Sequence, residues 1–402
     1  MRNYFVIFTG QAASLLGSEL VQFALIWWLA QTGGSATTLA MAALVGLAPS
    51  VALGPFAGVL IDRWNRRTAM IVADLSVALA TLALAILFAM EAAGSASVYA
   101  AMFVRSLGGA FQWPAMQAQT AALVGERHLT RIAGLNQAMR GVAGIAMPPL
   151  AALLLTAAPI STLLLIDIGT AALAIATLVA VRFPPPIRTD GRRDAPSFWA
   201  DLREGGRYVA RRPDLALLIA LIAILHFFAA PAFALVPVVV AREFRGGAFE
   251  LAWMQSASGL GLAIGGLTLG LWGGFRRRIE TVLSGIGLMG ACLAAFGSLP
   301  RGAASFALIP IFLAGLAASM AVGSFQAIQQ AIVPPGMQGR VFTISRSGID
   351  AMSPLGMVIA GPMADGLGIR PWYLAAGAVM AVMAGAAFFL PKLMNLEKRS
   401  DS

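Results

Sequence analysis

The sequence predicts an all-α membrane protein that crosses the bilayer many times, and three observations support this. Of 402 residues, 59% are hydrophobic and 11% are charged, whereas soluble chains carry about 25% charged residues. The apolar residues form long runs, and the mean hydropathy is +0.81. The basic residues gather on alternate connections between these runs. A soluble globular fold and a disordered chain are excluded, as is a disulfide scaffold, because Cys292 is the single cysteine.

Twelve apolar runs are each long enough to cross a bilayer as a helix, which takes about 20 residues. Charged residues, glycine or proline separate them. The predicted spans cover residues 4–31, 37–61, 68–91, 96–122, 131–157, 160–182, 213–241, 249–274, 279–299, 303–332, 340–367 and 371–391.

The basic residues predict the orientation, because short cytoplasmic loops accumulate Lys and Arg. With twelve spans and both termini on one side, 21 of the 28 Lys and Arg residues fall on that side. Four fall on the other side, and three lie within spans. We therefore expect both termini in the cytoplasm. The net charge of +10 follows from this topology and from contact with anionic lipids, so no nucleic-acid partner is expected.

The longest polar stretch divides the spans into two sets of six. We expect an N-terminal bundle over 1–182, a cytoplasmic linker over 183–212 and a C-terminal bundle over 213–402. The second part of the linker has the pattern of an amphipathic helix lying on the inner leaflet.

The two sets of spans resemble each other in order. Arg140 in span 5 precedes Pro148 by eight residues, and Arg346 in span 11 precedes Pro354 by eight. Spans 4 and 10, and the loops after spans 2 and 8, align at similar offsets. A duplicated six-helix unit is typical of transporters built from two parallel repeats.

The loop after span 2 carries a recognisable motif. It runs Gly58-Val-Leu60-Ile-Asp62-Arg63-Trp-Asn65-Arg66-Arg67. This resembles the signature loop of the major facilitator superfamily, in which glycine usually stands at the position of Asn65. Asparagine also tolerates a left-handed turn. The resemblance implies the major facilitator fold, with two pseudo-symmetric bundles of six helices. We expect a conformational lock at the cytoplasmic face from Gly58, Asp62, Arg63, Arg66, Arg67 and Asp74.

Three further segments resemble one branch of that superfamily, the macrolide-efflux type of drug–proton antiporter. They begin at Gly10 (Gly-Gln-Ala-Ala-Ser), at Leu53 (Leu-Gly-Pro-Phe-Ala-Gly) and at Ile359 (Ile-Ala-Gly-Pro-Met-Ala-Asp). The resemblance implies a secondary exporter of hydrophobic or amphipathic compounds, coupled to protons by alternating access. It implies a monomer in a bacterial-type cytoplasmic membrane, with a small-molecule substrate, protons and lipids as partners, and with spans 1, 4, 7 and 10 lining the cavity.

Charges within the spans are the candidates for coupling, because a charge at mid-bilayer is unfavourable by about 2.5–3.5 kcal/mol on insertion scales. Glu19 in span 1 is either a protonatable carboxylate lining the cavity or a permanent partner of an arginine. The same alternatives hold for Asp167 in span 6, where structural pairing is favoured. Arg105 in span 4 stands where the family often has an arginine linked to proton coupling.

Polar residues on helix faces are the candidates for the substrate cavity: Gln11, Ser18, Gln22, Gln112, Asn136, Arg140, His226, Gln326, Arg346 and Asp350. For some of these a structural role is favoured. Arg346 and Asp350 have the i,i+4 spacing of a neutralising pair, and a lone histidine such as His226 is more often a core residue than a proton relay. Asp365, near the outer end of span 11, is expected to pair with Arg370.

Two other functions stay open. Arg140 and Arg346 fit an exporter of siderophores or other anionic metabolites, and a receptor or scaffold without transport is an alternative of another class. No enzyme is expected, and no cofactor or metal, because the sequence has neither a Cys/His cluster nor a phosphate-binding Gly-Lys-Ser/Thr loop.

Overall fold

The computed structural model describes residues 2–33, 35–63, 65–124, 128–181 and 198–396. Its description of side chains leaves out residues 2–3, 54–63, 113, 118, 121–122, 129–130 and 198–201. The described residues are almost entirely helical and contain no β-strand, which confirms the predicted all-α class. Linker residues 183–197 lie outside the described residues, as do the side chains of Gly58, Asp62 and Arg63.

Each predicted span corresponds to a helical segment in the described part of the chain. The first six are α1 (Arg2–Thr32), α2 (Ala36–Arg63), α3 (Arg66–Ala89), α4 (Ser95–Leu123), α5 (Leu129–Ala157) and α6 (Ile160–Ala180). The linker helix is α7 (Phe198–Arg211). The rest are α8 (Pro213–Ala234), α9 (Val236–Val238), η2 (Val239–Glu243), α10 (Ala248–Trp272), α11 (Arg278–Ser298), α12 (Ala304–Ile332), α13 (Pro335–Leu367), α14 (Arg370–Phe388) and α15 (Pro391–Met394).

By length and composition, nine helical segments among the described residues are apolar enough to cross a membrane. The other long helices, α4, α10 and α13, are not among these nine. The chain divides into two compact units, which are described separately. Unit 1 comprises Met1–Arg188 and Gly247–Ser256, and unit 2 comprises Thr189–Gly246 and Ala257–Ser402.

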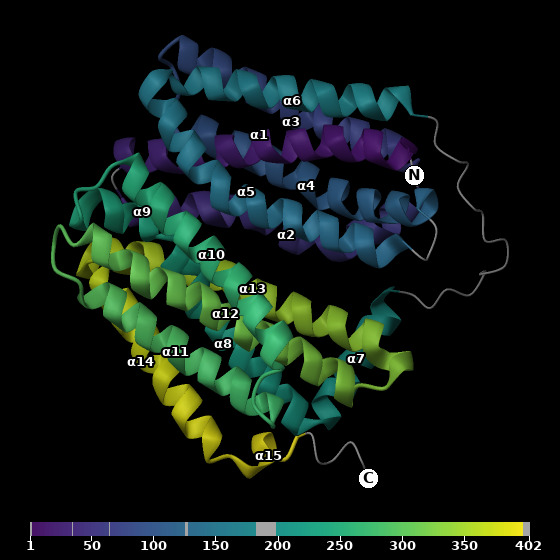
Figure 1. The fold of residues 1–402 in the computed structure, drawn as a ribbon, viewed down its shortest axis with the longest axis vertical. Helices are drawn as coiled ribbons and strands as arrows, with labels where there is room; N and C mark the ends of the chain where they lie inside the picture. Colours follow the sequence, from purple (N-terminus) through teal and green to yellow (C-terminus); the bar gives the residue numbers. More distant parts are fainter. Residues whose placement is uncertain (1, 34, 64, 125–127, 182–197, 397–402) are drawn as a thin grey trace. The chain divides into compact units, whose positions relative to one another are not determined.

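In unit 1, α1 packs against α6 and α5, while α3 packs against both α4 and α6 (Figure 1). Two glycines, Gly10 and Gly17, let α1 approach α6 closely. A Cβ atom on Gly17 would meet the Thr170 hydroxyl and lie 3.2 Å from the Asp167 Cα atom. A Cβ on Gly10 would lie 2.8 Å from the Thr177 Cγ2 atom. Small residues of this kind bring membrane helices into van der Waals contact.

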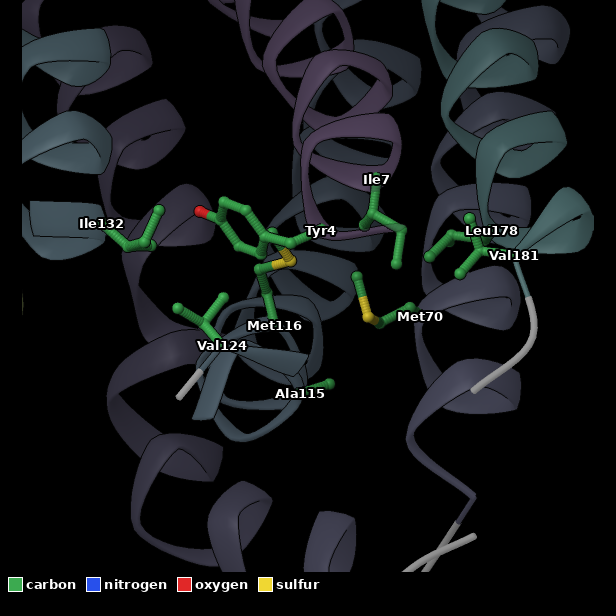
Figure 2. Close-up of a cluster of buried hydrophobic side chains, with 9 residues drawn as sticks. All are labelled: Tyr4, Ile7, Met70, Ala115, Met116, Val124, Ile132, Leu178 and Val181. Carbon is green, nitrogen blue, oxygen red and sulfur yellow. The ribbon is translucent and has the colours of Figure 1, made fainter. Parts of the chain in front are cut away.

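An apolar cluster fills one end of unit 1, where α1 and α3 begin and α4 and α6 end (Figure 2). Its buried members are Tyr4, Ile7, Met70, Ala115, Met116, Val124, Ile132, Leu178 and Val181. They come from five helices, so their packing fixes the ends of these helices against one another. The cluster contains no charged side chain.

In unit 2, α11 packs against α12 and α14, and α8 packs against α13. Helices α11 and α14 meet at paired glycines, since a Cβ on Gly290 would lie 2.8 Å from the Gly377 carbonyl oxygen. The predicted amphipathic helix forms as α7 and packs against α13. There the Arg340 Nη1 atom lies 2.9 Å from Glu204 Oε2.

Span 7 differs from the single helix that the sequence predicts over 213–241. It is divided into α8, α9 and the π-helical segment η2. Pro231 and Pro237 lie at the division, and proline removes a backbone N–H and obstructs the preceding turn. The wider π turn follows, and the amide of Phe244 donates to the Val239 carbonyl at 3.0 Å.

The ion pairs near the end of this span also differ from the expectation. Asp365 pairs with Arg242 at 3.7 Å, while Arg370 lies 3.2 Å from Glu243, which is also 3.5 Å from Arg301. The predicted Asp365–Arg370 pair is therefore wrong. Arg242 and Glu243 both lie on the π segment. They provide partners for Asp365 and Arg370 that the local sequence of span 11 does not reveal.

We predict that Gly17→Val separates α1 from α6 and lowers the free energy of unfolding by about 1–3 kcal/mol, the usual range for overpacking. The measurement is the thermal unfolding midpoint of the purified protein. Gly109→Val on α4 is the matched control, because a Cβ at Gly109 meets nothing within 4 Å. Equal midpoints for the two variants would contradict the close contact between α1 and α6.

Candidate functional site

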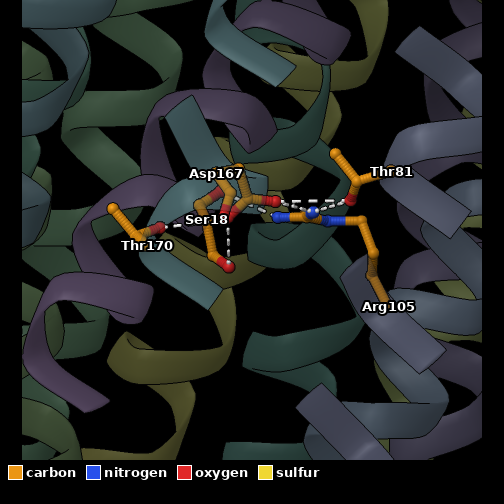
Figure 3. A network of polar contacts seen from close by, with 5 residues as sticks. All are labelled: Ser18, Thr81, Arg105, Asp167 and Thr170. Carbon is orange, nitrogen blue, oxygen red and sulfur yellow. Dashed lines mark hydrogen bonds and ion pairs between the residues drawn. The ribbon is translucent and has the colours of Figure 1, made fainter. Parts of the chain in front are cut away.

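An ion pair between Arg105 of α4 and Asp167 of α6 lies inside unit 1 (Figure 3). The exposed fractions of the two side chains are 9% and 2%. The Asp167 carboxylate also accepts a hydrogen bond from the Ser18 hydroxyl of α1 at 3.1 Å and one from Thr81 of α3 at 3.3 Å. The Arg105 guanidinium donates to the Thr81 hydroxyl at 2.8 Å and to the Ser18 carbonyl at 3.2 Å. The pair thus joins four helices.

The backbone around Asp167 is held as well. The Thr170 hydroxyl donates to the Asp167 carbonyl at 2.9 Å, one turn further along α6. Thr81 and Thr170 are not among the site residues that the sequence pattern predicts. Thr81 follows Asp74 by seven residues, so the helical period would have placed both on one face of α3.

Glu19 lies next to Ser18 on α1, but it takes no part in the contact network around Asp167. Within the described residues it interacts electrostatically with Arg105 and Arg140 without a contact ion pair. Its side chain is exposed, as is that of Arg140 on α5. Because Asp167 already neutralises Arg105, the charge of Glu19 is held by weaker, longer-range attraction.

Asp74 of α3 forms a second buried polar cluster with two of the glutamines predicted in the cavity. Gln11 of α1 donates to Asp74 Oδ2 at 2.9 Å, and Gln112 of α4 donates to Asp74 Oδ1 at 2.6 Å. Gln112 also donates to Gln11 Oε1 at 2.6 Å. We expected Asp74 to complete the network of the motif loop. Its hydrogen-bonding partners in the described part are instead these two amides.

The described residues of the motif loop fix the start of α3. Asn65 does not adopt the left-handed turn that the sequence suggests; its φ is −68°. It is the N-cap of α3, and its Oδ1 accepts from the amides of Arg67 at 3.1 Å and Thr68 at 3.3 Å. Asparagine therefore stands here because it caps a helix.

Arg67 connects the motif to the last turn of α6. Its Nε donates to the Leu178 carbonyl at 2.9 Å and its Nη2 to the Val179 carbonyl at 2.7 Å. The last carbonyls of a helix have no intrahelical partner and form the negative end of its dipole, so a guanidinium is favourable there. Arg66 is half-buried at the first position of α3. How these residues act on Asp62 lies outside the described side chains.

The remaining candidates are spread over both units. In unit 1, Gln22 and Asn136 are half-buried on α1 and α5. In unit 2, Gln326 is exposed on α12, and Arg346 lies 3.5 Å from Asp350 on α13, as the i,i+4 spacing predicts.

His226 of α8 has its Nδ1 atom 3.0 Å from the Ile222 carbonyl of the preceding turn. This contact satisfies the ring within its own helix. It favours the structural interpretation of His226 over that of a proton relay.

Buried charges joined across apolar helices define a multi-pass membrane protein with a polar interior. Comparison with known proteins gives the class. Residues 7–247 match the sequence model of the Major Facilitator Superfamily, and the chain belongs to this superfamily. The protein is therefore a membrane transporter and not an enzyme.

Similarity to individual proteins extends over nearly the whole chain. The chain is 32% identical to macrolide efflux protein A of Streptococcus pyogenes over 395 residues, which cover 98% of this chain and 97% of that protein. It is 24% identical to the multidrug efflux pump Tap of Mycolicibacterium fortuitum, over 96% and 94% of the two chains. A crystal structure of a bacterial homologue of the lysosomal transporter Spinster shares the fold, with a TM-score of 0.74, 14% identity and coverage of 99% and 98%.

We predict that Asp167→Asn lowers the free energy of unfolding by about 3–5 kcal/mol, because it leaves the buried Arg105 guanidinium without its anionic partner. The double variant Arg105→Gln/Asp167→Asn is expected to recover much of this loss. Thermal or denaturant unfolding of the purified protein measures both effects.

The control for this prediction is Arg346→Gln, which breaks an exposed pair and should change stability by about 1 kcal/mol or less. The interpretation of the buried pair fails if the single and double variants at Arg105 and Asp167 unfold alike.

Proposed function

We propose that this transporter exports hydrophobic or amphipathic compounds of the macrolide or multidrug type. The observation that carries this proposal is the 32% identity to macrolide efflux protein A, which extends over 98% of the chain. The similarity to the multidrug efflux pump Tap supports the same substrate class. The full-length match also favours transport over a receptor or scaffold role.

The proposal includes coupling to inward proton movement by alternating access of two six-helix bundles. Glu19 is the favoured coupling carboxylate. It is exposed beside the Arg105–Asp167 pair and is attracted by two arginines without a contact ion pair. A proton on Glu19 would remove this attraction, so its protonation would change the interactions between α1, α4 and α5. Asp167, held by Arg105, Thr81 and Ser18, has a structural role in this scheme.

The alternative of anionic-metabolite export depends on positive charge inside the transporter. Arg346 is neutralised by Asp350 at 3.5 Å, and Arg140 interacts with Glu19. Since both arginines face a carboxylate, we favour uncharged or cationic amphipathic substrates. The proposal further places both termini in the cytoplasm of a bacterial-type cell, with the transporter acting as a monomer. The motif loop would act as the conformational lock.

We predict that Glu19→Gln abolishes the dependence of macrolide uptake on a pH gradient in everted membrane vesicles. Gradient-driven uptake should fall to the level seen without a gradient, because the amide cannot bind and release a proton. Uptake of a labelled macrolide, with and without an uncoupler, is the measurement.

Glu280→Gln on α11 is the control for this experiment, since Glu280 forms an exposed i,i+3 pair with Arg277. Undiminished, fully pH-dependent uptake by the Glu19→Gln variant would remove Glu19 from the coupling mechanism.

We predict the membrane orientation from two exposed arginines on neighbouring loops of unit 2. In a Cys292→Ser background, a membrane-impermeant maleimide should label Arg301→Cys in intact cells. It should label Arg276→Cys only after permeabilisation, because the basic loop after α10 is expected inside. Labelling of both cysteines in intact cells, or the reverse pattern, would contradict the proposed topology.

A further inference from the structure

Helices α1, α3 and α4 carry two polar layers, one built around Asp167 and the other around Asp74. Ser18, Thr81 and Arg105 belong to the layer of Asp167. Gln11, Asp74 and Gln112 form the other layer, and each lies seven residues from its counterpart. Seven residues are about two helical turns, or roughly 10 Å along the axis. Gly17 and Gly10 repeat the same spacing where α1 meets α6.

The two layers differ in the residue that α4 supplies. In the first layer it supplies Arg105, whose charge neutralises Asp167. In the second layer the equivalent position of α4 is Gln112, an uncharged amide. Each layer holds one carboxylate, but only the Asp167 layer holds a cation. Arg105 thus pairs with Asp167, whereas no described cation in the second layer pairs with Asp74.

The surroundings of Asp74 disfavour a second negative charge. The residue is 3% exposed, and an unneutralised buried carboxylate is strongly unfavourable. The charged or titratable side chains described on the helices packed around it are Tyr4 and Glu19 of α1, Arg66 and Arg67 of α3, Tyr99 and Arg105 of α4, and Asp167 of α6. Arg67 donates hydrogen bonds to carbonyls at the end of α6, and Arg105 forms an ion pair with Asp167. Burial disfavours the charge of Asp74 most, the negative charge of Asp167 adds to this, and the hydrogen bonds from Gln11 and Gln112 offset part of it.

The two glutamines suit both protonation states of a carboxyl group. An ionised carboxylate only accepts hydrogen bonds, and a protonated one also donates one. A glutamine amide offers N–H groups and a carbonyl oxygen, so rotation of its terminal group by half a turn exchanges a donor for an acceptor. Gln11 and Gln112 therefore solvate Asp74 with or without its proton, which the guanidinium of Arg105 cannot do for Asp167.

We propose that Asp74, Gln11 and Gln112 form a second proton-binding site, in which Asp74 takes up a proton as the pH falls below neutrality. A role of this site in coupling rests on the proposed proton-coupled export. The binding of the proton itself does not. The site lies between the Arg105–Asp167 layer and the apolar cluster at the end of unit 1, on the same three helices as both.

The test is pH-difference infrared spectroscopy of the purified full-length protein in lipid nanodiscs. On a downward pH step from neutrality to about pH 5.5, where ordinary exposed carboxylates stay ionised, the wild type should gain the carbonyl stretch of a protonated carboxylic acid. Asp74→Asn should abolish this band. Asp365→Asn, which removes an exposed carboxylate already ionised at neutral pH, should leave it unchanged. A band that persists in Asp74→Asn at wild-type intensity would overturn the proposal.

The second variant is Gln112→Arg. It gives the Asp74 layer a cation at the position equivalent to Arg105 in the Asp167 layer. It should remove the same band by keeping Asp74 ionised. If the band survives in this variant while the protein stays folded by thermal unfolding, the proposal is overturned.

The infrared readout needs no substrate, so it is independent of the proposed export. Failure of macrolide flux in proteoliposomes, with the Asp74 band intact, would count against the proposed function alone. Loss of pH dependence of that flux in Asp74→Asn, with downhill flux retained, would support the role in coupling. A flux in that variant with wild-type pH dependence would overturn that role.

Discussion

The buried pair of Arg105 and Asp167 is the constraint on which the rest of unit 1 depends. A charge at mid-bilayer is unfavourable by about 2.5–3.5 kcal/mol on insertion scales, so each of the two needs the other in place before the helices can pack. The hydroxyls of Ser18 and Thr81 complete the pair from α1 and α3. This ion pair and its hydroxyl partners therefore constrain the rotation of all four helices about their axes, together with the close packing of small residues.

The packing of small residues transmits this constraint along the bundle. Gly10 and Gly17 hold α1 against α6 at two points separated by two turns. Three of the helices that meet at Asp167, namely α1, α3 and α4, also meet at Asp74. Below this second layer, the apolar cluster and the contact of Arg67 with the end of α6 fix the helix ends. Glu19 stands outside these fixed contacts. The proposed coupling uses this difference between the paired carboxylate of Asp167 and the exposed carboxylate of Glu19.

Local patterns were predicted well where their cause is local. The twelve apolar runs fold as helical segments, the amphipathic linker helix forms as α7, and Arg346 and Asp350 pair at i,i+4. The errors have causes that are not local. Asp365 pairs with Arg242 because span 7 ends in a π turn. Asn65 occupies the position of a family glycine as an N-cap, because the loop enters α3 in an extended conformation.

The sequence by itself determined that this chain is a polytopic helical membrane protein and to which superfamily it belongs. Hydropathy and short motifs act over one span, and a single chain displays them directly. Only the tertiary structure decided which polar side chains meet. Asp167 and Arg105 are 62 residues apart, and Asp74 and Gln11 are 63 apart. Partners at such separations depend on how each helix is rotated against its neighbours, and the close packing of glycines and hydroxyls across helices sets that rotation.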